Sequence, residues 1–217
     1  MRKTICWALV ASVGMLTIGP WAGAQEGPRV RGTTIAITGE NPFISLAREA
    51  GEKPLTSVSF WRVVHSPAGM GHACYVTSDL TGDGPSADDL RVVFTDNEEL
   101  LEYLNREIMT VFDGKHLDNP YPVVKATFTR QGDTRGEYRE LIAAEQHSVE
   151  LVWKQFLPAL QLEIPVGSLT IATTIIPAQT AEVHIDGVKA AGSAFPRPEG
   201  TAQGSSASLA WAETWFR

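Results

Sequence analysis

The segment Thr180-Ala-Glu-Val-His-Ile-Asp186 alternates apolar residues with polar or charged ones. Because neighbouring side chains of a strand point to opposite faces, Ala181, Val183 and Ile185 would share one face and the polar residues the other. A strand with one apolar and one polar face is typical of an antiparallel sheet that has a core on one side and water on the other. The segment therefore predicts such a sheet.

Similar segments recur along the chain. Runs rich in Val, Ile, Thr and aromatic residues predict further strands at residues 57–65, 72–78, 90–95, 122–130, 168–176 and 207–216. Glycine-containing turns separate these runs and leave little room for helical crossovers, which again favours antiparallel pairing. Residues 136–157 fit either a helix or strands, and we favour two strands.

One amphipathic helix is expected at residues 97–112. Asp96 and Glu99 have the spacing of a capping box, and Asp113-Gly114 follows as a stop signal. The apolar positions recur at helical spacing and would form one stripe; they are Leu100, Leu101, Leu104, Ile108 and Val111 or Phe112. A single helix beside a mainly antiparallel sheet predicts a mainly β (α+β) fold: an antiparallel β-barrel or sandwich with one amphipathic helix packed on it.

The first 24 residues have the pattern of a signal peptide. A basic start of Arg2 and Lys3 precedes an apolar stretch at residues 5–16, and Ala22-Gly-Ala24 supplies the small residues of a cleavage site. The apolar stretch is too short to span a bilayer. We therefore expect export to the periplasm or the medium, no membrane span after cleavage, and a single β-rich domain at residues 25–217 with a mobile loop at 189–206.

Charge and cysteine content limit the possible partners. Cleavage removes two basic residues and no acidic one, so the mature chain is more acidic than the full chain, whose net charge is −7. Nucleic acids and anionic membrane surfaces bind clustered Lys and Arg, so neither is expected as a partner. Cys74 is the one cysteine after residue 24, so no disulfide forms within the mature chain. An exposed Cys74 could link two chains, and the sequence leaves the oligomeric state open.

The segment His65-Ser-Pro-Ala-Gly-Met-Gly-His72-Ala-Cys74 is a candidate zinc or copper site. If its loop closes a hairpin in which His65 lies opposite His72, then both imidazoles and the Cys74 thiol share one face. Imidazole and thiolate are ligands for zinc and copper, and the same trio could provide a cysteine nucleophile with a histidine base. Strand-end histidines with a small buried cysteine explain the same residues.

Two acidic segments offer weaker signals. Residues 79–89 resemble the first half of a calcium-binding loop, with candidate ligands Asp79, Thr81, Asp83, Asp88 and Asp89, although Leu90 stands where the bidentate Glu is required. An exposed acidic turn explains these residues equally well. The polar face of residues 180–186 places His184 between Glu182 and Asp186, which suits acid–base chemistry under a cleft and otherwise indicates a solvated face.

Tryptophans near the C-terminus suggest an apolar pocket. Strict alternation over residues 208–217 would place Trp211, Glu213 and Trp215 on one side of a strand. With Trp61 and Trp153 they could form an aromatic wall that has Glu213 as its polar contact. Tryptophans that simply fill the core are the alternative.

Three functions remain open on these observations. The first is an exported protein that binds a small, partly apolar ligand at Trp61, Trp153, Trp211, Glu213 and Trp215. The second is a metal-dependent enzyme or redox metalloprotein that uses His65, His72 and Cys74 with zinc or copper. The third is a structural or interaction protein that is stabilised by calcium at residues 79–89. The sequence does not decide whether the protein is an enzyme.

Overall fold

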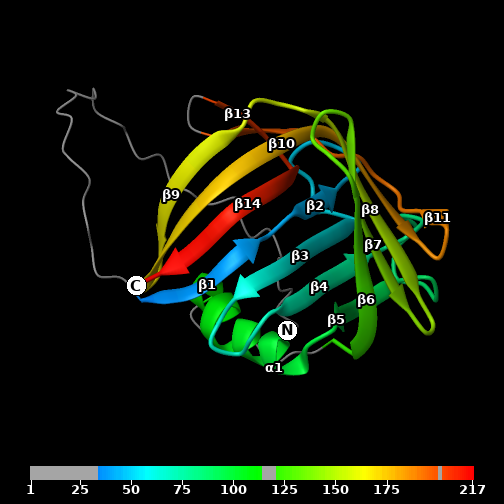
Figure 1. Ribbon diagram of the computed structural model, residues 1–217. Coiled ribbons are helices and arrows are strands. Elements are labelled where there is room, and N and C mark those ends of the chain that lie inside the picture. Colours follow the sequence, from blue (N-terminus) through cyan, green and yellow to red (C-terminus); the bar gives the residue numbers. More distant parts are fainter. Residues whose placement is uncertain (1–33, 114–120, 200–201) are drawn as a thin grey trace.

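Strands make up most of the protein in the computed structural model, which describes residues 34–113, 121–199 and 202–217 (Figure 1). In chain order, they are β1 (Ile35–Glu40), β2 (Phe43–Leu46), β3 (Thr56–His65), β4 (Gly71–Ser78), β5 (Leu90–Thr95), β6 (Val123–Gly132), β7 (Glu137–Ala144), β8 (Ser148–Phe156), β9 (Leu160–Val166), β10 (Leu169–Ile185), β11 (Val188–Lys189), β12 (Pro196–Glu199), β13 (Ala202–Ser205) and β14 (Ala207–Phe216). One helical segment consists of α1 (Glu98–Tyr103), the π-helical turn η1 (Leu104–Met109) and α2 (Thr110–Asp113).

The main sheet closes on itself. Its pairing runs β14-β2-β3-β4-β5-β6-β7-β8-β10, and β10 pairs with β14 again. The pairs are antiparallel except β5 and β6, which are parallel and are connected through the helical segment. Parallel neighbours require such a crossover, whereas the hairpins elsewhere do not. The predicted mainly β fold, a barrel with one helix packed on it, is confirmed.

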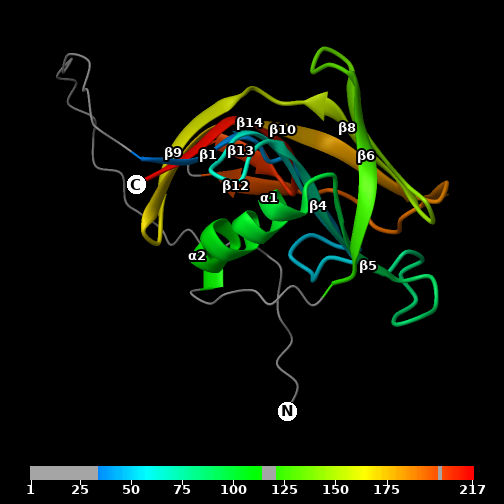
Figure 2. The ribbon, with the colours of Figure 1, turned by 60° about the horizontal axis from the view of Figure 1, so that its bottom comes forward.

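The helical segment covers the outer face of part of the sheet. Figure 2 shows it beneath the curved strands β9, β10 and β14. The predicted stripe of Leu100, Leu101, Leu104 and Ile108 is buried. The predicted N-cap is wrong by one residue: the side chain of Asn97 accepts the hydrogen bond from the backbone N–H of Leu100. None of the described helices has the length and hydropathy needed to cross a membrane.

Two apolar cores result from the alternation of side chains along each strand. On β3, Val58 and Phe60 point into the ring of strands, where they join a core built from most of the barrel strands. Trp61 and Val63 point the other way and pack in a second core with the helical segment. The inner face and the outer face of the same strands are therefore both buried on this side of the barrel.

Residues whose structure the sequence left uncertain are paired. Residues 136–157 contain the hairpin of β7 and β8, as favoured above. Residues 189–206, predicted as a mobile loop, include the hairpin of β12 and β13, and Ser193 exchanges backbone hydrogen bonds with Ala47. The predicted signal peptide at residues 1–24 lies outside the described residues.

We expect Gly39 of β1 to be required for the closure of the sheet. A Cβ atom at this position would lie 2.1 Å from the carbonyl oxygen of Arg62, because β1 runs very close to β3. Gly39→Ala should therefore push the two backbones apart and lower the free energy of unfolding by about 3 kcal/mol, measured by urea denaturation.

Gly136 provides the matched control for this substitution. Apart from Gly136 itself and its two chain neighbours, no heavy atom lies within 4 Å of the Cβ that would be built there, so Gly136→Ala should leave the free energy of unfolding nearly unchanged. Equal losses in the two variants would contradict the close approach of β1 and β3.

Candidate functional site

The tryptophans of the predicted pocket separate into two pairs. Trp61 and Trp215 lie in the core under the helical segment, with ring centroids 6.0 Å apart. Trp153 and Trp211 lie on the inner side of the barrel, where each packs edge-on against Tyr138 at 5.7 and 5.8 Å. The four rings therefore do not form one wall.

A bulge in β14 causes this separation. Trp211 pairs with Thr174, but Thr214 pairs with Ala172, so β14 contains one more residue than β10 between these pairs. Ala212 occupies the bulge with φ of 50°. Since one extra residue reverses the faces of the strand beyond it, Trp211 points into the barrel and Trp215 points toward the helical segment. An alanine with positive φ carries no signal in the sequence.

The candidate zinc or copper ligands do not converge, because the register assumed for their hairpin is wrong. His72 pairs with Arg62, Cys74 pairs with Phe60, and His65 lies opposite Thr38 of β1. This shift of three residues turns His65 away from the face that carries His72 and Cys74. Within the described ranges, no group of three His, Cys, Asp or Glu side chains is arranged to hold a metal.

Cys74 is fully buried in the barrel. Burial raises the pKa of its thiol well above the usual value, and the negative charge of Glu140 raises the pKa further. A thiol in this environment stays protonated, whereas nucleophiles and metal ligands act as thiolates. Its burial also removes it as a link between two chains.

The candidate calcium ligands form turns with their own neighbours. Asp79 accepts hydrogen bonds from the backbone N–H groups of Gly82 and Gly84, at 2.8 and 3.1 Å. Asp88 accepts one from the Ser86 hydroxyl, which lowers the pKa of this exposed carboxyl. The remaining candidates, Thr81, Asp83 and Asp89, are exposed. The described geometry is that of an acidic turn.

The polar face of β10 carries a network of ion pairs. Glu182 lies 2.8 Å from Lys189 Nζ, 3.3 Å from His184 Nε2 and 3.7 Å from Lys154 Nζ. The bond from Lys189 contributes most to lowering the pKa of Glu182 to about 2, and the bond from His184 adds to it. Asp186 lies beyond the end of the strand and pairs with His147 instead. This arrangement fits the solvated-face alternative.

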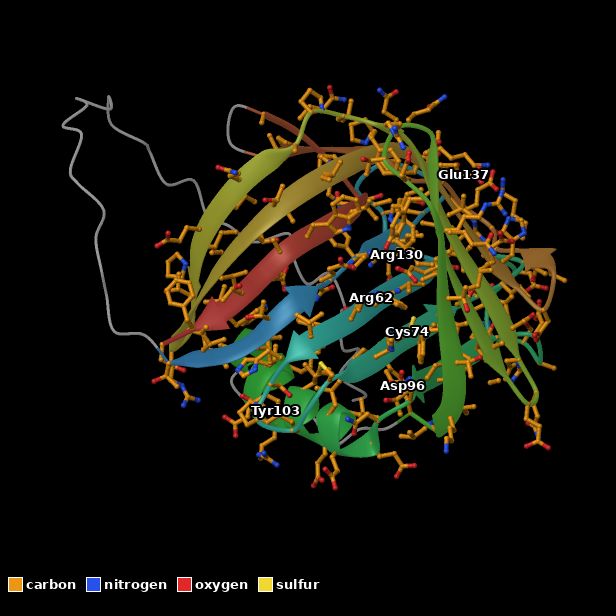
Figure 3. All side chains as sticks on the ribbon, in the orientation of Figure 1. Arg62, Cys74, Asp96, Tyr103, Arg130 and Glu137 are labelled. Carbon is orange, nitrogen blue, oxygen red and sulfur yellow. The ribbon has the colours of Figure 1, made fainter. Side chains whose placement is uncertain are left out.

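A charged cluster inside the barrel was missed from the sequence. Glu140 of β7 has no solvent exposure, and it accepts hydrogen bonds from Arg62 Nη2 at 2.6 Å, Arg130 Nε at 3.2 Å and the Tyr138 hydroxyl. Glu40 of β1 pairs with both Arg130 and Arg62. Four strands thus contribute to one neutral set of two arginines and two glutamates, of which Figure 3 labels the two arginines, Arg62 and Arg130.

The cluster keeps its own groups in fixed protonation states. Burial raises the pKa of Tyr138 well above its usual range, and the adjacent charge of Glu140 raises it further. For Arg130, burial acts to lower the pKa, but the hydrogen bond to Glu40 and the nearby negative charges outweigh burial and raise it. The tyrosine therefore remains a hydrogen-bond donor and the arginine remains charged.

His72 lies next to this cluster on the inner face of β4. Asp96 accepts two hydrogen bonds from it, one from the backbone N–H and one at Nδ1, both at 2.6 Å. The imidazole stacks on Phe128, with ring centroids 4.6 Å apart and an angle of 14°. These contacts explain why Asp96 does not cap the helix, because its carboxylate is engaged by His72.

Three buried nitrogen atoms on the inner face lack a hydrogen-bond partner among the described residues. They are Arg62 Nε, His72 Nε2 and Trp211 Nε1. Buried polar groups are nearly always paired in native proteins, and leaving one unpaired costs about 1–3 kcal/mol. Arg62 belongs to the charged cluster, His72 pairs with Arg62, and Trp211 packs on Tyr138, which is bonded to Glu140. A ligand or water at this cluster could satisfy such atoms.

Next to these atoms, the barrel wall is closed by contacts between side chains, without backbone hydrogen bonds between the facing strands. β6 pairs with β5 as far as Lys125, and over the described residues its later part pairs only with β7. Phe128 of β6 packs on Phe60 of β3 and His72 of β4 without a backbone ladder between these strands. Arg130 of β6 is linked to Arg62 of β3 through the carboxylates of Glu40 and Glu140. We call this line of contact the seam.

Side chains along the seam are partly open to solvent. The exposed fraction is 18% for His72, 22% for Arg62 and 33% for Arg130. A shallow cavity of about 330 Å³ opens beside Asp96 at the start of α1, lined by acidic side chains and Lys125. The seam is thus the partly accessible place where charged and aromatic groups of the barrel interior meet.

The sequence does contain a signal for this cluster. Arg62 follows Val58 and Phe60 at the spacing of one strand face, and Glu140 stands between Tyr138 and Ile142 in the same way. A charged residue at an otherwise apolar alternating position indicates a buried ion. The partners of each ion could not be identified in this way.

Glu213 is buried in the wall between β1 and β10. Trp215 Nε1 donates a hydrogen bond to its Oε1 at 2.6 Å, so the expected polar contact for a ligand is occupied by a neighbouring indole. Burial raises the pKa of this carboxyl to about 7, against the smaller lowering effects of the hydrogen bonds from Trp215 and Thr173.

Glu213 should make the protein less stable at neutral and alkaline pH than at acidic pH. Below pH 4.5 the Glu213 carboxyl is protonated in both the folded and the unfolded protein. Between pH 4.5 and about 7 it is ionised in the unfolded protein and still protonated in the folded one, so stability falls as the pH rises. Above pH 7 the accumulated loss is about 3 kcal/mol. Glu213→Gln should remove this loss, so the variant should gain stability over the wild type between pH 5 and pH 8 in urea denaturation.

Glu163→Gln is the matched control, because Glu163 is exposed on β9, which pairs with β10. This variant should follow the wild-type pH dependence. A Glu213→Gln variant that does the same would show that the Glu213 carboxyl is ionised in the folded protein at neutral pH.

Comparisons with known proteins give little further information. No protein-family model and no curated protein matches the chain. Among solved structures, the chain is similar to one described as "Structural Studies of Acetoacetate Decarboxylase", with 11% sequence identity and a TM-score of 0.40 over 86% of this chain and 87% of that chain.

Proposed function

We propose that the protein is exported and binds a small, partly apolar molecule at the seam of the barrel. The observation that carries this proposal is the set of three buried nitrogen atoms without partners: Arg62 Nε, His72 Nε2 and Trp211 Nε1. Polar atoms of a bound molecule would satisfy them and so offset the cost of their desolvation.

Aromatic rings beside these atoms would hold the apolar part of the molecule. Phe128 packs on Phe60 at 5.8 Å and on His72, and Trp211 packs on Tyr138. Small-molecule sites typically combine such aromatic walls with a few polar groups that fix orientation. Movement of the Phe128 ring would open the seam without breaking any backbone hydrogen bond of the sheet.

The geometry favours binding over the metal-dependent functions. His65 lies on the opposite face from His72 and Cys74, and Asp79 and Asp88 of the acidic segment are engaged in turns. The seam instead joins charged, aromatic and unpaired polar groups at one place. Binding requires only these groups, without a rearrangement of strands.

A ligand should perturb Trp211 and spare the tryptophans under the helical segment. We expect compounds from a fragment screen that bind the seam to shift the indole N–H resonance of Trp211 in two-dimensional NMR, assigned with Trp211→Phe. Phe128→Ala should weaken such compounds about tenfold, because it removes one aromatic wall.

Thr129→Ala is the matched control for this experiment. Thr129 neighbours Phe128 on β6 but is exposed on the opposite face, so its substitution should leave affinity unchanged. Compounds that shift only Trp61 or Trp215, or a screen without any binder, would contradict binding at the seam.

Export can be tested independently of binding. We expect the chain, expressed in a bacterial host, to appear in the periplasm or the medium. Mass spectrometry should give the mass of a chain that starts at Gln25, because the small residues at positions 22–24 precede the cleavage point. Ala24→Pro should block this processing. An intact N-terminus on protein recovered from the cytoplasm would refute export.

A further inference from the structure

The polar groups of the seam define the hydrogen-bonding character of its ligand. When the imidazole of His72 is neutral, Nδ1 carries the proton that is donated to the Asp96 carboxylate, and Nε2 carries a lone pair. Asp96 also accepts the backbone N–H of His72, so the carboxylate and the ring are fixed in this relation. In this tautomer the unpartnered Nε2 is a hydrogen-bond acceptor on the inner face.

A hydrogen-bond donor stands directly opposite. Arg62 pairs with His72 across β3 and β4, and residues paired in this way share a face with Cβ atoms about 5 Å apart. Arg62 Nη2 is held by Glu140 at 2.6 Å, while Nε lies 3.6 Å from Glu40, beyond hydrogen-bond distance. Its N–H is therefore free to donate to a ligand.

One hydroxyl group satisfies both atoms. Its hydrogen would be donated to His72 Nε2, and its oxygen would accept the N–H of Arg62. A carboxylate has no hydrogen to donate to His72, and an ether likewise only accepts. Only a group that both donates and accepts is complementary to the pair.

The charges around the pair favour an uncharged ligand. Arg62 and Arg130 are balanced by Glu40 and Glu140, so these four groups are neutral together, and the Asp96 carboxylate on His72 adds a negative charge. An added anion would lie beside the two glutamates without an unpaired cation to neutralise it. Burying such a charge costs far more than burying a neutral hydroxyl.

Aromatic rings pack on the side chains that carry these two nitrogen atoms, and the guanidinium carbon of Arg62 lies 5.6 Å from the centre of the Phe60 ring. The ring of Phe60 lies 6.0 Å from that of His72 and 5.8 Å from that of Phe128, and Phe128 stacks on His72. Building on the binding function proposed above, we propose that the seam binds small uncharged aromatic alcohols of the phenol class, with the hydroxyl between His72 Nε2 and Arg62 Nε.

Four probes of similar size separate the possible ligand classes: phenol, which donates and accepts; anisole, which only accepts; benzoate, which is charged; and toluene, which is apolar. Binding is measured by NMR titration at pH 7, where phenol is uncharged. We expect phenol to bind at least about tenfold more tightly than each of the other three.

Two variants test the assigned contacts. His72→Phe keeps a ring for Phe128 to stack on but removes Nε2, and Arg62→Lys keeps the positive charge beside Glu140 but removes the Nε–H group. Each should abolish the preference for phenol over anisole. His65→Phe is the control, since His65 is exposed and on the opposite face, and it should keep the preference. Circular dichroism confirms that each variant is folded.

The outcomes distinguish this inference from the binding function on which it rests. Equal binding of phenol and anisole, or tighter binding of benzoate or toluene, would overturn the phenol class. So would a preference for phenol that survives both seam variants. If none of the four probes binds but another screened compound shifts Trp211, the phenol class fails and binding at the seam stands. A screen without any binder overturns both.

Discussion

The buried carboxylate of Glu140 is the constraint on which one side of the barrel depends. A charge without solvent exposure is tolerated only when hydrogen bonds and opposite charges replace its water. Glu140 has three such partners, Arg62 on β3, Arg130 on β6 and Tyr138 on its own strand. Since removing any partner leaves an undercompensated charge, the position of β6 and β7 relative to β3 is fixed by ions where no backbone ladder joins them.

This arrangement explains why the candidate site lies where it does. Elsewhere around the ring, strands are joined by backbone hydrogen bonds, and opening the wall would break several at once. At the seam, Phe128 packs on Phe60 of β3 and His72 of β4, and Arg130 is linked to Arg62 through the carboxylates that the two arginines share. Side chains change rotamer far more readily than a sheet loses a strand. The ion pairs that close the barrel at the seam thus hold the strands together, and the same place is where a ligand could enter the barrel interior.

Much of the fold could be predicted from alternation, because burial on one or both faces leaves a direct pattern in the sequence. The apolar stripe of the helix and the two strands in 136–157 follow from it. Register could not be predicted, because it depends on turn geometry that the apolar pattern does not specify. The shift of three residues that separates His65 from His72 and the bulge at Ala212 each reversed a face. Both expected sites depended on those faces.

The residues of the candidate site could be recognised in the sequence, but their pairing could not. Arg62 and Glu140 each interrupt an apolar face, so alternation marks both as unusual. They are 78 residues apart, however, and the sequence of either strand does not indicate which residue pairs with its charge. The order of strands in the closed sheet brings them together, through a parallel step from β5 to β6 that requires the helical crossover. Residues for a site could therefore be selected from the sequence, whereas their assembly depends on long-range topology that only the structure shows.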